Sequence, residues 1–400
     1  MKSPSGKVAL LFRYGAGEHV DFLPALPEIL RRLHEEGLEV HHFGFRGKES
    51  LPADLRRWVQ VHEGPFRVNR GSQWDKHLKA LLWLMGLPFL GWRLQRRGFD
   101  KVFVDETLPL SAMLLRMGYR GKLLFTVHDF FMEIYWEPRS LLRAPARWIQ
   151  RLDARAWRRL DRIFTRTESA KEFLTGKGLC PDRISVLPDP VNLQLFHPER
   201  NRDQREAFRA AWGVTPQDLL MVHHGIMHPN KGNLCLIQAV QRLRERLPHL
   251  KLMLIGDGPE MPELRQTVTA LGLQDRVLLT GWLPGLADIS RALKAGDIGL
   301  VMRKGLPGDH FHVTSTLVHN LACGLPVLSA RLRGISEVVE EGREGFLFDP
   351  VCGEEFDRKL IQLAESPELR KEMGLAARQK AEESFDPGRI AEEYVKCLCP

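Results

Sequence analysis

The stretch Gly225-Ile-Met-His-Pro-Asn-Lys231-Gly232 decides how the C-terminal half of this 400-residue chain is interpreted. It follows an apolar run, and small or charged residues mark similar turns further on, in Gly256-Asp-Gly-Pro-Glu260, Val277-Leu-Leu-Thr-Gly281 and Ala322-Cys-Gly-Leu-Pro326. In an open α/β sheet such turns gather at the carboxyl ends of the strands, where ligands bind. One lysine, several glycines and several helix starts at one edge therefore predict a site for a phosphorylated, nucleotide-like ligand.

The whole chain alternates apolar runs with helix-type patterns, which predicts parallel sheets covered by helices. Strands are expected at residues 7–12, 39–45, 58–62, 101–104, 123–127, 162–167, 184–187, 219–225, 251–255, 276–280, 298–302 and 326–329, with a hairpin-like strand at 345–350. The proline-rich residues 188–198 indicate a domain boundary. We therefore expect two Rossmann-like, doubly wound α/β domains, 1–198 and 199–385, facing a central cleft, with a last helix at 386–400 packing back on the first domain.

The two halves of the chain differ in charge. Residues 1–200 contain 33 Lys+Arg and 23 Asp+Glu, a net charge of +10, whereas residues 201–400 contain 25 and 27, a net charge of −2, which together make the +8 of the whole chain. A basic half favours an anionic partner such as a phosphate-bearing lipid, a membrane surface, a polyanion or nucleic acid, and a merely solvated basic surface is the alternative. Because no nucleic-acid recognition motif accompanies the charge, we expect no nucleic-acid partner.

Two basic segments, residues 78–97 and 139–166, mix tryptophan and leucine with clustered arginines. Helices that carry both kinds of side chain are typical of surfaces that rest on an anionic bilayer. The alternative is that their apolar faces pack on the sheet, as in any α/β protein. The side chains that we expect to make a peripheral membrane contact are Trp83, Trp92, Arg93, Arg96, Arg97, Trp148 and Trp157.

Targeting signals and cysteine spacing bear on the compartment. No run approaches the roughly 20 apolar residues of a membrane span, and the N-terminus shows no apolar signal region. The six cysteines are scattered, without Cys-x-x-Cys pairs, which is typical of reduced thiols in a cytosolic protein. We therefore expect a cytoplasmic protein, with peripheral attachment at the inner face of the membrane as an option.

Lys231 is the leading candidate for ligand binding. It lies between an expected strand and an expected helix, and Gly232 beside it lets the backbone approach a ligand near the positive end of that helix. We interpret Lys231 as a contact to a diphosphate, the alternative being an inert surface lysine. His128 and Asp129 follow the expected strand 123–127, and we place them near the reacting group, the alternative being caps of the next helix.

Further candidates lie at turns. Thr314, Ser315 and Thr316 open an expected helix, where hydroxyls act as caps and exposed N–H groups also bind phosphate. Glu337 is either a ligand contact or a helix-start charge. Gly15-Ala-Gly17 lacks the third glycine of a dinucleotide fingerprint and predicts only a tight turn open to a ligand. The histidines near these turns fit no standard metal spacing, so we expect neither a metal nor another cofactor; they are His224, His228, His310, His312 and His319.

As a set, these motifs resemble the family-4 glycosyltransferases of GT-B fold, among the group 1 glycosyl transferases. The C-terminal resemblance rests on Lys231-Gly232, Gly256-Asp-Gly-Pro-Glu260, Gly281, Ala295-Gly-Asp297, Ala322-Cys-Gly-Leu-Pro326, Glu337-Val-Val and Glu341-Gly-Arg-Glu-Gly-Phe-Leu-Phe. A looser N-terminal resemblance rests on the first loop from Gly15 to His19, Thr126-Val-His128-Asp129, Asp161-Arg-Ile-Phe-Thr-Arg-Thr-Glu168-Ser and Val186-Leu-Pro-Asp-Pro-Val-Asn192.

The resemblance implies a retaining transferase that needs no metal. The C-terminal domain would hold a nucleotide-diphosphate sugar and the N-terminal domain a lipid-linked or cell-surface glycan acceptor. Lys231 and helix N–H groups would stabilise the leaving diphosphate, and His128 would orient the donor sugar. The catalytic assignments are His128, Lys231 and Asp129. The donor-binding assignments are Gly15, Gly17, Gly225, Lys231, Gly256, Gly258, Thr314, Ser315, Thr316, His319 and Glu337.

The sequence departs from the family pattern at the donor site. The family pairs two glutamates eight positions apart, and Phe311 and His319 stand in their places. Ile226 occupies the position of a common arginine, and Pro188-Asp-Pro190 replaces the usual Pro-Asn-Gly turn. These departures leave two alternatives open: a catalytically degenerate binding or scaffold protein, and a nucleotide-sugar epimerase or hydrolase of the same fold.

Overall fold

A computed structural model describes residues 6–48, 50–67, 73–105, 108–128, 143–198, 202–350 and 353–399. The chain divides into two compact units: unit 1 comprises residues 1–190 and 387–400, and unit 2 comprises residues 191–386. The division falls after Pro190 rather than after residue 198, because Val191 and Phe196 are buried in the core of unit 2. The expected cleft between the domains stays a prediction.

Unit 1 is built on a seven-stranded sheet of order β3-β2-β1-β4-β5-β6-β7, and every strand pair in it is parallel. Its strands are β1 Gly6–Leu11, β2 Leu38–Arg46, β3 Gln60–Arg67, β4 Lys101–Val104, β5 Lys122–Thr126, β6 Arg162–Thr165 and β7 Ile184–Val186. The inner strands are continuous apolar runs because helices cover both faces of a parallel sheet.

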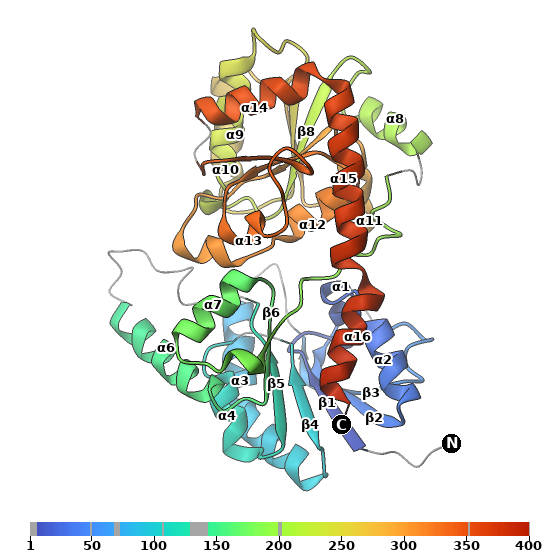
Figure 1. Ribbon diagram of the computed structural model, residues 1–400, viewed down its shortest axis with the longest axis vertical. Coiled ribbons are helices and arrows are strands. Elements are labelled where there is room, and N and C mark those ends of the chain that lie inside the picture. The colour runs from blue at the N-terminus through green and yellow to red at the C-terminus, as the bar shows by residue number, and fades with distance from the viewer. Residues whose placement is uncertain are drawn as a thin grey trace. The chain divides into compact units, whose positions relative to one another are not determined.

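The helices of unit 1 include the last helix of the chain (Figure 1). They are α1 Ala16–Phe22, α2 Leu26–Glu35, α3 Gln73–Arg96, α4 Ser111–Gly118, α6 Arg143–Trp157, α7 Glu168–Gly176, the 3-10 turn η1 Pro181–Arg183 and α16 Pro387–Leu398. Ile390 and Tyr394 of α16 are buried in the same cluster as Leu30 of α2 and Phe103 of β4. The last helix therefore completes the core of the first unit.

Unit 2 is built on a six-stranded parallel sheet of order β10-β9-β8-β11-β12-β13. Its strands are β8 Leu219–His224, β9 Leu250–Ile255, β10 Val277–Gly281, β11 Ile298–Val301, β12 Val327–Ala330 and β13 Gly345–Phe348. Its helices are α8 Arg202–Ala211, η2 Pro229–Lys231, α9 Asn233–Leu243, α10 Met261–Ala270, α11 Leu286–Lys294, η3 Pro307–Phe311, α12 Ser315–Ala322, α13 Arg333–Ser336, α14 Glu354–Glu365 and α15 Pro367–Phe385.

Both units are doubly wound, which confirms the predicted α/β class and its two Rossmann-like domains. In unit 2 the chain runs outward from β8 through β9 to β10, and then from β11 through β12 to β13 on the other side. The strand order thus reverses between β8 and β11, and in unit 1 between β1 and β4. Ligands of open α/β sheets bind beyond the carboxyl ends of the strands at such a reversal.

Some expectations from the sequence are wrong. Residues 345–350 form no hairpin: β13 is a buried strand that pairs parallel to β12, because the chain returns to the sheet edge in the same direction. Trp83 is buried, with its ring centroid 5.4 Å from that of Phe45, so it faces the core and not a membrane. Cys235 is disulfide-bonded, whereas reduced thiols were expected, because sequence spacing does not show which residues folding brings together. Cys180, Cys323, Cys397 and Cys399 are free.

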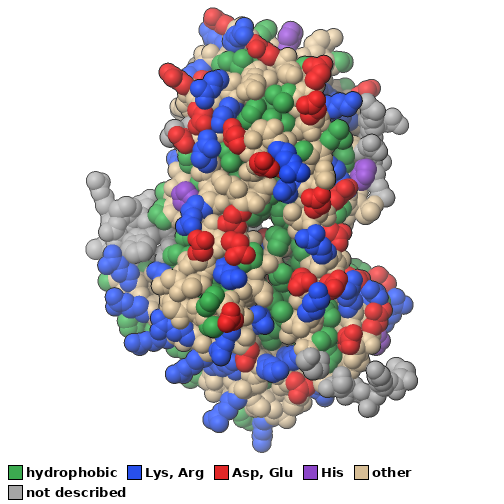
Figure 2. Space-filling model, viewed as in Figure 1, with side chains coloured by type: hydrophobic (Ala, Val, Ile, Leu, Met, Phe, Trp, Pro, Cys, Tyr) green, Lys and Arg blue, Asp and Glu red, His purple; other side chains and the backbone are tan. Residues whose placement is uncertain are grey.

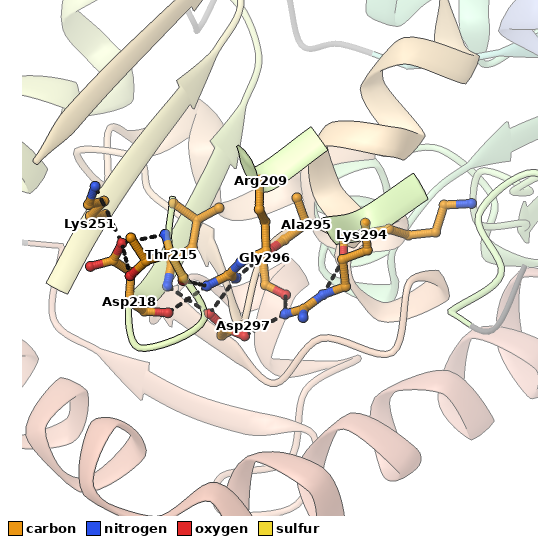
Figure 3. Close-up of polar contacts among 10 residues, drawn as sticks. Arg209, Thr215, Asp218, Lys251, Lys294, Ala295, Gly296 and Asp297 are labelled. Atoms are coloured by element: carbon orange, nitrogen blue, oxygen red, sulfur yellow. Dashed lines mark hydrogen bonds and ion pairs between the residues drawn. The ribbon is translucent and has the colours of Figure 1, made fainter. Parts of the chain in front are cut away.

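A polar clamp closes the amino ends of the strands of unit 2 (Figure 3). Arg209 of α8 donates to Asp297 Oδ2 at 3.1 Å and to the carbonyl of Ala295 at 2.8 Å, and Arg205 donates to Asp297 Oδ1 at 2.6 Å. Asp297 also accepts from the N–H of Leu220, the second residue of β8, at 2.8 Å. This clamp fixes α8 to the sheet at the edge opposite the carboxyl ends, so it is structural.

Candidate donor site and histidine network

Glycines bring the loops after β8 and β9 together. Gly225 and Gly256 have φ values of +148° and +136°, where side chains are rarely tolerated. A Cβ on Gly256 would lie 2.0 Å from the carbonyl oxygen of Gly225, and one on Gly258 would lie 2.3 Å from that of Met227. The Met227 N–H donates to the Asp257 carbonyl at 3.0 Å. Gly256 and Gly258 are therefore required for contact between two loops, apart from any ligand.

Lys231 sits where the loops after β8 and β11 meet. Gly232 follows it with φ +68° and ψ 24°, and a Cβ there would lie 2.8 Å from Cγ of Met302, the residue after β11. The Lys304 N–H donates to the Asn230 carbonyl at 3.1 Å. Gly232 precedes α9, whose start has no side-chain cap among the described residues. Lys231 is thus held beside a positive helix end at the reversal of strand order.

The three hydroxyls at the start of α12 have different environments. Thr314 caps the helix by accepting the Leu317 N–H at 3.2 Å, and the Thr316 hydroxyl donates to the His224 carbonyl at 2.8 Å. Ser315 is exposed. The Thr314 hydroxyl therefore caps α12 and the Thr316 hydroxyl holds α12 against the end of β8, whereas the Ser315 side chain is exposed.

A stacked pair of imidazoles stands near the end of β8. His319 Nδ1 lies 3.2 Å from His224 Nε2, and the His319 ring stacks on Phe196 with centroids 4.0 Å apart. Burial lowers the pKa of His319 to about 3 and, together with the neighbouring His319 and His223, holds the pKa of His224 well below its usual range. Both rings are neutral at neutral pH, so an uncharged pair stands where the family pattern has a glutamate.

The positive charge of Lys231 also affects a histidine at the end of β8. Burial lowers the pKa of His223 to about 4, and the positive charges of Lys231 and Arg303 contribute in the same direction. His223 Nδ1 lies 3.0 Å from the Leu300 carbonyl of β11, which can only accept, so Nδ1 carries the proton. Lys231, His223 and His224 therefore belong to one electrostatic neighbourhood beyond β8 and β11.

Glu337 lies at the end of a helix and not at the start of one. It is the exposed C-cap residue of the short helix α13, after Ser336. Its donor-site role stays a prediction. Within the described residues, no group of three or more His, Cys, Asp or Glu side chains is placed to hold a metal ion.

Unit 1 contains a buried polar network centred on Asp105, the residue directly after β4. Asp105 is fully buried, and its Oδ1 and Oδ2 lie 2.9 Å from His128 Nε2 and 3.0 Å from His19 Nε2. His19 Nδ1 in turn lies 3.1 Å from His42 Nε2. Although desolvation opposes ionisation, the two histidines hold the pKa of Asp105 well below its usual range. Asp105 is therefore an ionised, buried anion.

Arg166 fixes the tautomer of His128. Its Nη2 donates to His128 Nδ1 at 2.9 Å, and since a guanidinium can only donate, Nδ1 must be the unprotonated nitrogen. The proton of His128 then sits on Nε2 and is donated to Asp105. Arg166 also donates to the Tyr394 hydroxyl at 3.0 Å and pairs with Asp189 at 2.7 Å. Both ring nitrogens of His128 are engaged within unit 1, so a sugar contact would have to exchange one of these bonds.

The structure gives different outcomes for the other N-terminal candidates, Gly15, Gly17 and Asp129. A Cβ on Gly15 would lie 2.2 Å from the Gly47 Cα, so Gly15 is required where the first loop contacts the end of β2. Gly17 lies inside α1, which begins at Ala16, so the tight turn expected at Gly17 is wrong. Asp129 lies outside the described residues, as do residues 139–142 of the second basic segment.

Sequence reasoning missed most of this network. It singled out His128 but not Asp105, His42 or the buried Arg166. One signal was available: Asp105, like Asp129, is a carboxylate placed directly after an apolar strand. The other partners lie on different strands and on α1, and no local pattern relates them.

Two doubly wound α/β units with polar clusters beyond their strand ends are the architecture of the GT-B class. A profile of the family described as Glycosyl transferases group 1 matches residues 218–366, and one of Glycosyltransferase Family 4 matches residues 26–195. The chain belongs to the family-4 glycosyltransferases of GT-B fold and is a transferase, as the sequence resemblance predicted.

Similar proteins have varied substrates in their names. The chain is 28% identical to the N-acetyl-alpha-D-glucosaminyl L-malate synthase of Bacillus anthracis over 92% of this chain and 90% of that protein. It is 25% identical to a GDP-mannose-dependent alpha-(1-6)-phosphatidylinositol monomannoside mannosyltransferase of Mycolicibacterium smegmatis, over 70% and 72%. Anabaena HepE, solved in complex with UDP, shares the fold with a TM-score of 0.71 at 20% identity, over 98% and 99%.

Proposed function

We propose that the protein is a retaining glycosyltransferase that takes a sugar from a nucleotide diphosphate held by unit 2. It transfers this sugar to a lipid-linked or cell-surface glycan acceptor held by unit 1 at the cytosolic face of a membrane. Transferase activity follows from the family, whereas the donor, the stereochemistry and the membrane are the proposal. The names of the relatives support a range of acceptors that includes a phosphatidylinositol glycan and L-malate.

The observation that carries the donor proposal is the position of Lys231 at the strand-order reversal of unit 2. Its backbone is held by Gly232 against Met302, and α9 begins directly after it. A nucleotide-sugar reacts when the bond between its anomeric carbon and the diphosphate breaks, and the leaving oxygens gain negative charge. A lysine and helix N–H groups already in place stabilise that charge. We therefore propose that no metal is needed.

The imidazole pair shapes the rest of the donor site. Where the family pattern has a glutamate, the neutral His319 stacks on Phe196 and contacts His224. We propose that sugar or ribose hydroxyls are bound here by neutral imidazole nitrogens and backbone groups rather than by a carboxylate. In unit 1, Asp105 and Arg166 would hold His128 in one orientation for the donor sugar or the acceptor.

Nucleotide-dependent thermal stabilisation tests the donor site. UDP is the first probe, followed by GDP, ADP, CMP and TDP, each with wild type, Lys231→Ala and Lys371→Ala. Lys371 is an exposed lysine of α15 and controls for the loss of one charge. A nucleotide at 100 times its Kd should stabilise wild type and the control by about 2.7 kcal/mol, and Lys231→Ala much less. Equal stabilisation of all three proteins would remove Lys231 from the proposed site.

Two further assays test the reaction. Proton NMR of the product formed from an α-linked donor should show an α-linkage, since a retaining transferase preserves the anomeric configuration. Activity should survive EDTA, because Lys231 and helix N–H groups supply the positive charge. A β-linked product would contradict the retaining mechanism, and loss of activity that Mg²⁺ or Mn²⁺ restores would contradict metal independence.

A further inference from the structure

Helix α3 exposes a continuous apolar stripe. Its exposed large apolar side chains recur every three or four residues, which places them on one side of a helix. They are Trp74, Leu78, Leu81, Met85, Phe89 and Trp92. Trp74 is 87% exposed, Met85 69% and Phe89 64%. At 1.5 Å per residue the stripe is about 27 Å long. Exposed apolar residues on protein surfaces are ordinarily scattered singly, so a continuous row of this length indicates an interaction surface.

The opposite face of α3 is fixed to the rest of unit 1. Trp83, Leu87 and Leu94 are buried there. A Cβ on Gly91 would lie 2.6 Å from the Leu115 carbonyl oxygen of α4, and one on Gly118 would lie 2.2 Å from that of Pro88. Backbone contacts this close leave no room for α3 to rotate, so the stripe stays on the outside.

Cations border the stripe. Residues 73–97 contain five Lys or Arg and one Asp, and Arg93, Arg96 and Arg97 are exposed at the end of α3. The Arg96 guanidinium lies 4.7 Å from the ring centroid of Trp92. On α6, which packs on α4, the exposed Arg147, Arg151 and Arg155 follow each other at intervals of four residues. Figure 2 shows Lys and Arg side chains gathered over α6.

We propose that the α3 stripe is a docking surface for an anionic lipid bilayer. Its apolar side chains would enter the boundary between headgroups and acyl chains, while the arginines of α3 and α6 contact lipid phosphates. Charge selects this occupant: a second copy of the chain laid on the stripe would set basic helices against each other, whereas anionic headgroups complement them. This inference deepens the proposed membrane-bound acceptor, but vesicle binding requires no turnover.

The surface differs from the one expected from the sequence. Trp92, Arg93, Arg96 and Arg97 belong to it, and Trp148 of α6 is 60% exposed beside the arginine row. Trp83 belongs to the core, and Trp157 is half-buried. Trp74, Met85 and Phe89 carry most of the exposed apolar surface and were not singled out.

Vesicle co-sedimentation of the full chain tests the proposal. The probes are phosphatidylcholine vesicles with and without an equal part of phosphatidylglycerol. The apolar variant is Trp74→Ser, Met85→Ser and Phe89→Ser combined, and the charge variant is Arg93→Gln, Arg96→Gln and Arg97→Gln combined. The matched control is Trp282→Ser with Leu375→Ser, two exposed side chains of unit 2.

Wild type and control should bind the anionic vesicles equally. The apolar variant should lose about tenfold or more in affinity, and the charge variant should lose the preference for phosphatidylglycerol. All proteins should keep the wild-type melting temperature, since only exposed side chains change. Wild-type binding in the apolar variant, or no wild-type binding to either vesicle, overturns the proposal.

Two further measurements distinguish membrane docking from dimerisation through the stripe and from the proposed donor site. Sedimentation velocity that shows a stable wild-type dimer, lost in the apolar variant, would assign the stripe to a second copy and overturn the proposal. Stabilisation by UDP reports on unit 2 alone. Vesicle binding without nucleotide binding would therefore contradict the proposed donor while the docking surface stands, and the reverse result would contradict the docking surface only.

Discussion

A single guanidinium organises the polar interior of unit 1. Arg166 is the donor that forces the His128 proton onto Nε2, and it reaches α16 through Tyr394. The partners are far apart along the chain: 38 residues separate Arg166 from His128, and 228 separate it from Tyr394. At this scale one residue that cannot lose its charge orients His128 so that its Nε2 meets the ionised Asp105.

We expect Arg166→Met to be strongly destabilising. It would leave the buried Leu187 carbonyl and Tyr394 hydroxyl without their donor, and the partly exposed Asp189 without its ion-pair partner. Removing one partner of such a network costs about 3–5 kcal/mol. Urea unfolding followed by circular dichroism would measure this cost. Arg162→Met is the control, since Arg162 opens β6, the strand that Arg166 follows, and its hydrogen bond among the described residues goes to an exposed carbonyl, that of Asp182. Equal costs for both variants would contradict the central position of Arg166.

The second residue-scale prediction concerns acid. Burial lowers the pKa of His319 to about 3 and that of His223 to about 4, from a usual value of 6.5. Below pH 6.5 these histidines bind protons in the unfolded chain but stay unprotonated in the folded protein. The free energy of unfolding therefore falls as pH falls. Each histidine should cost about 2 kcal/mol between pH 7 and pH 5.

Melting temperatures across that range would show the loss. His319→Gln should flatten the curve, because glutamine takes up no proton, whereas His249→Gln, at an exposed position, should leave its shape unchanged. A curve for His319→Gln that parallels the wild type would mean that His319 is already protonated in the folded protein at pH 5.

At the scale of elements, the loops of the candidate donor site depend on close backbone approach. Gly256 combines a positive φ with a Cβ position 2.0 Å from the Gly225 carbonyl oxygen. Gly272 also has a positive φ, of +63°, but nothing lies within 4 Å of its Cβ position. Alanine substitutions at Gly256 and Gly272 therefore distinguish the cost of backbone strain, present at both positions, from the cost of a steric clash, present only at Gly256.

Gly256→Ala should therefore destabilise the protein by about 3 kcal/mol or more, and Gly272→Ala by only about 1 kcal/mol. Guanidinium denaturation would compare the two. Nucleotide-induced stabilisation should also weaken in Gly256→Ala, since the loops after β8 and β9 must part. A Gly256→Ala protein as stable as the Gly272→Ala protein would mean that these loops shift at little cost.

The sequence predicts the helices and strands of this molecule better than it predicts the candidate site. The strands were predictable because parallel strands are continuous apolar runs, and the turn residues of Gly225 to Gly232 mark their ends. The edge strand β13 was misjudged because its short apolar run and flanking glycines also suit a hairpin. Exposure of α3 was only half predictable, because its stripe and its buried face are both apolar.

The site itself was less accessible from sequence. Lys231 could be found because its signal is local. The Asp105 network could not, since 86 residues separate His19 from Asp105 and no periodicity relates residues on different elements. The resemblance to a family supplied a position for His128 and a stretch that includes Arg166, but not the hydrogen bond between them that fixes the tautomer.

At the scale of the whole molecule, α16 makes unit 1 discontinuous in sequence. Its residues Ile390 and Tyr394 belong to the unit 1 core, whereas residues 191–386 form unit 2 without a break. A chain ending at Asp386 should therefore keep unit 2 intact and lose stability in unit 1. Limited proteolysis should cleave within residues 6–190 of the truncated chain and spare 191–386. Equal resistance of both units would contradict the role of α16.

This discontinuity sets the order in which the protein is completed during its synthesis. The ribosome makes most of unit 1 before unit 2, yet unit 1 lacks α16 until residues 387–398 emerge. Unit 2, begun second, has its whole sequence available earlier. The usual order, in which the N-terminal domain folds first, is thereby reversed. The nascent first unit is the part of this protein that a ribosome-associated chaperone would have to shelter while residues 191–386 are being made.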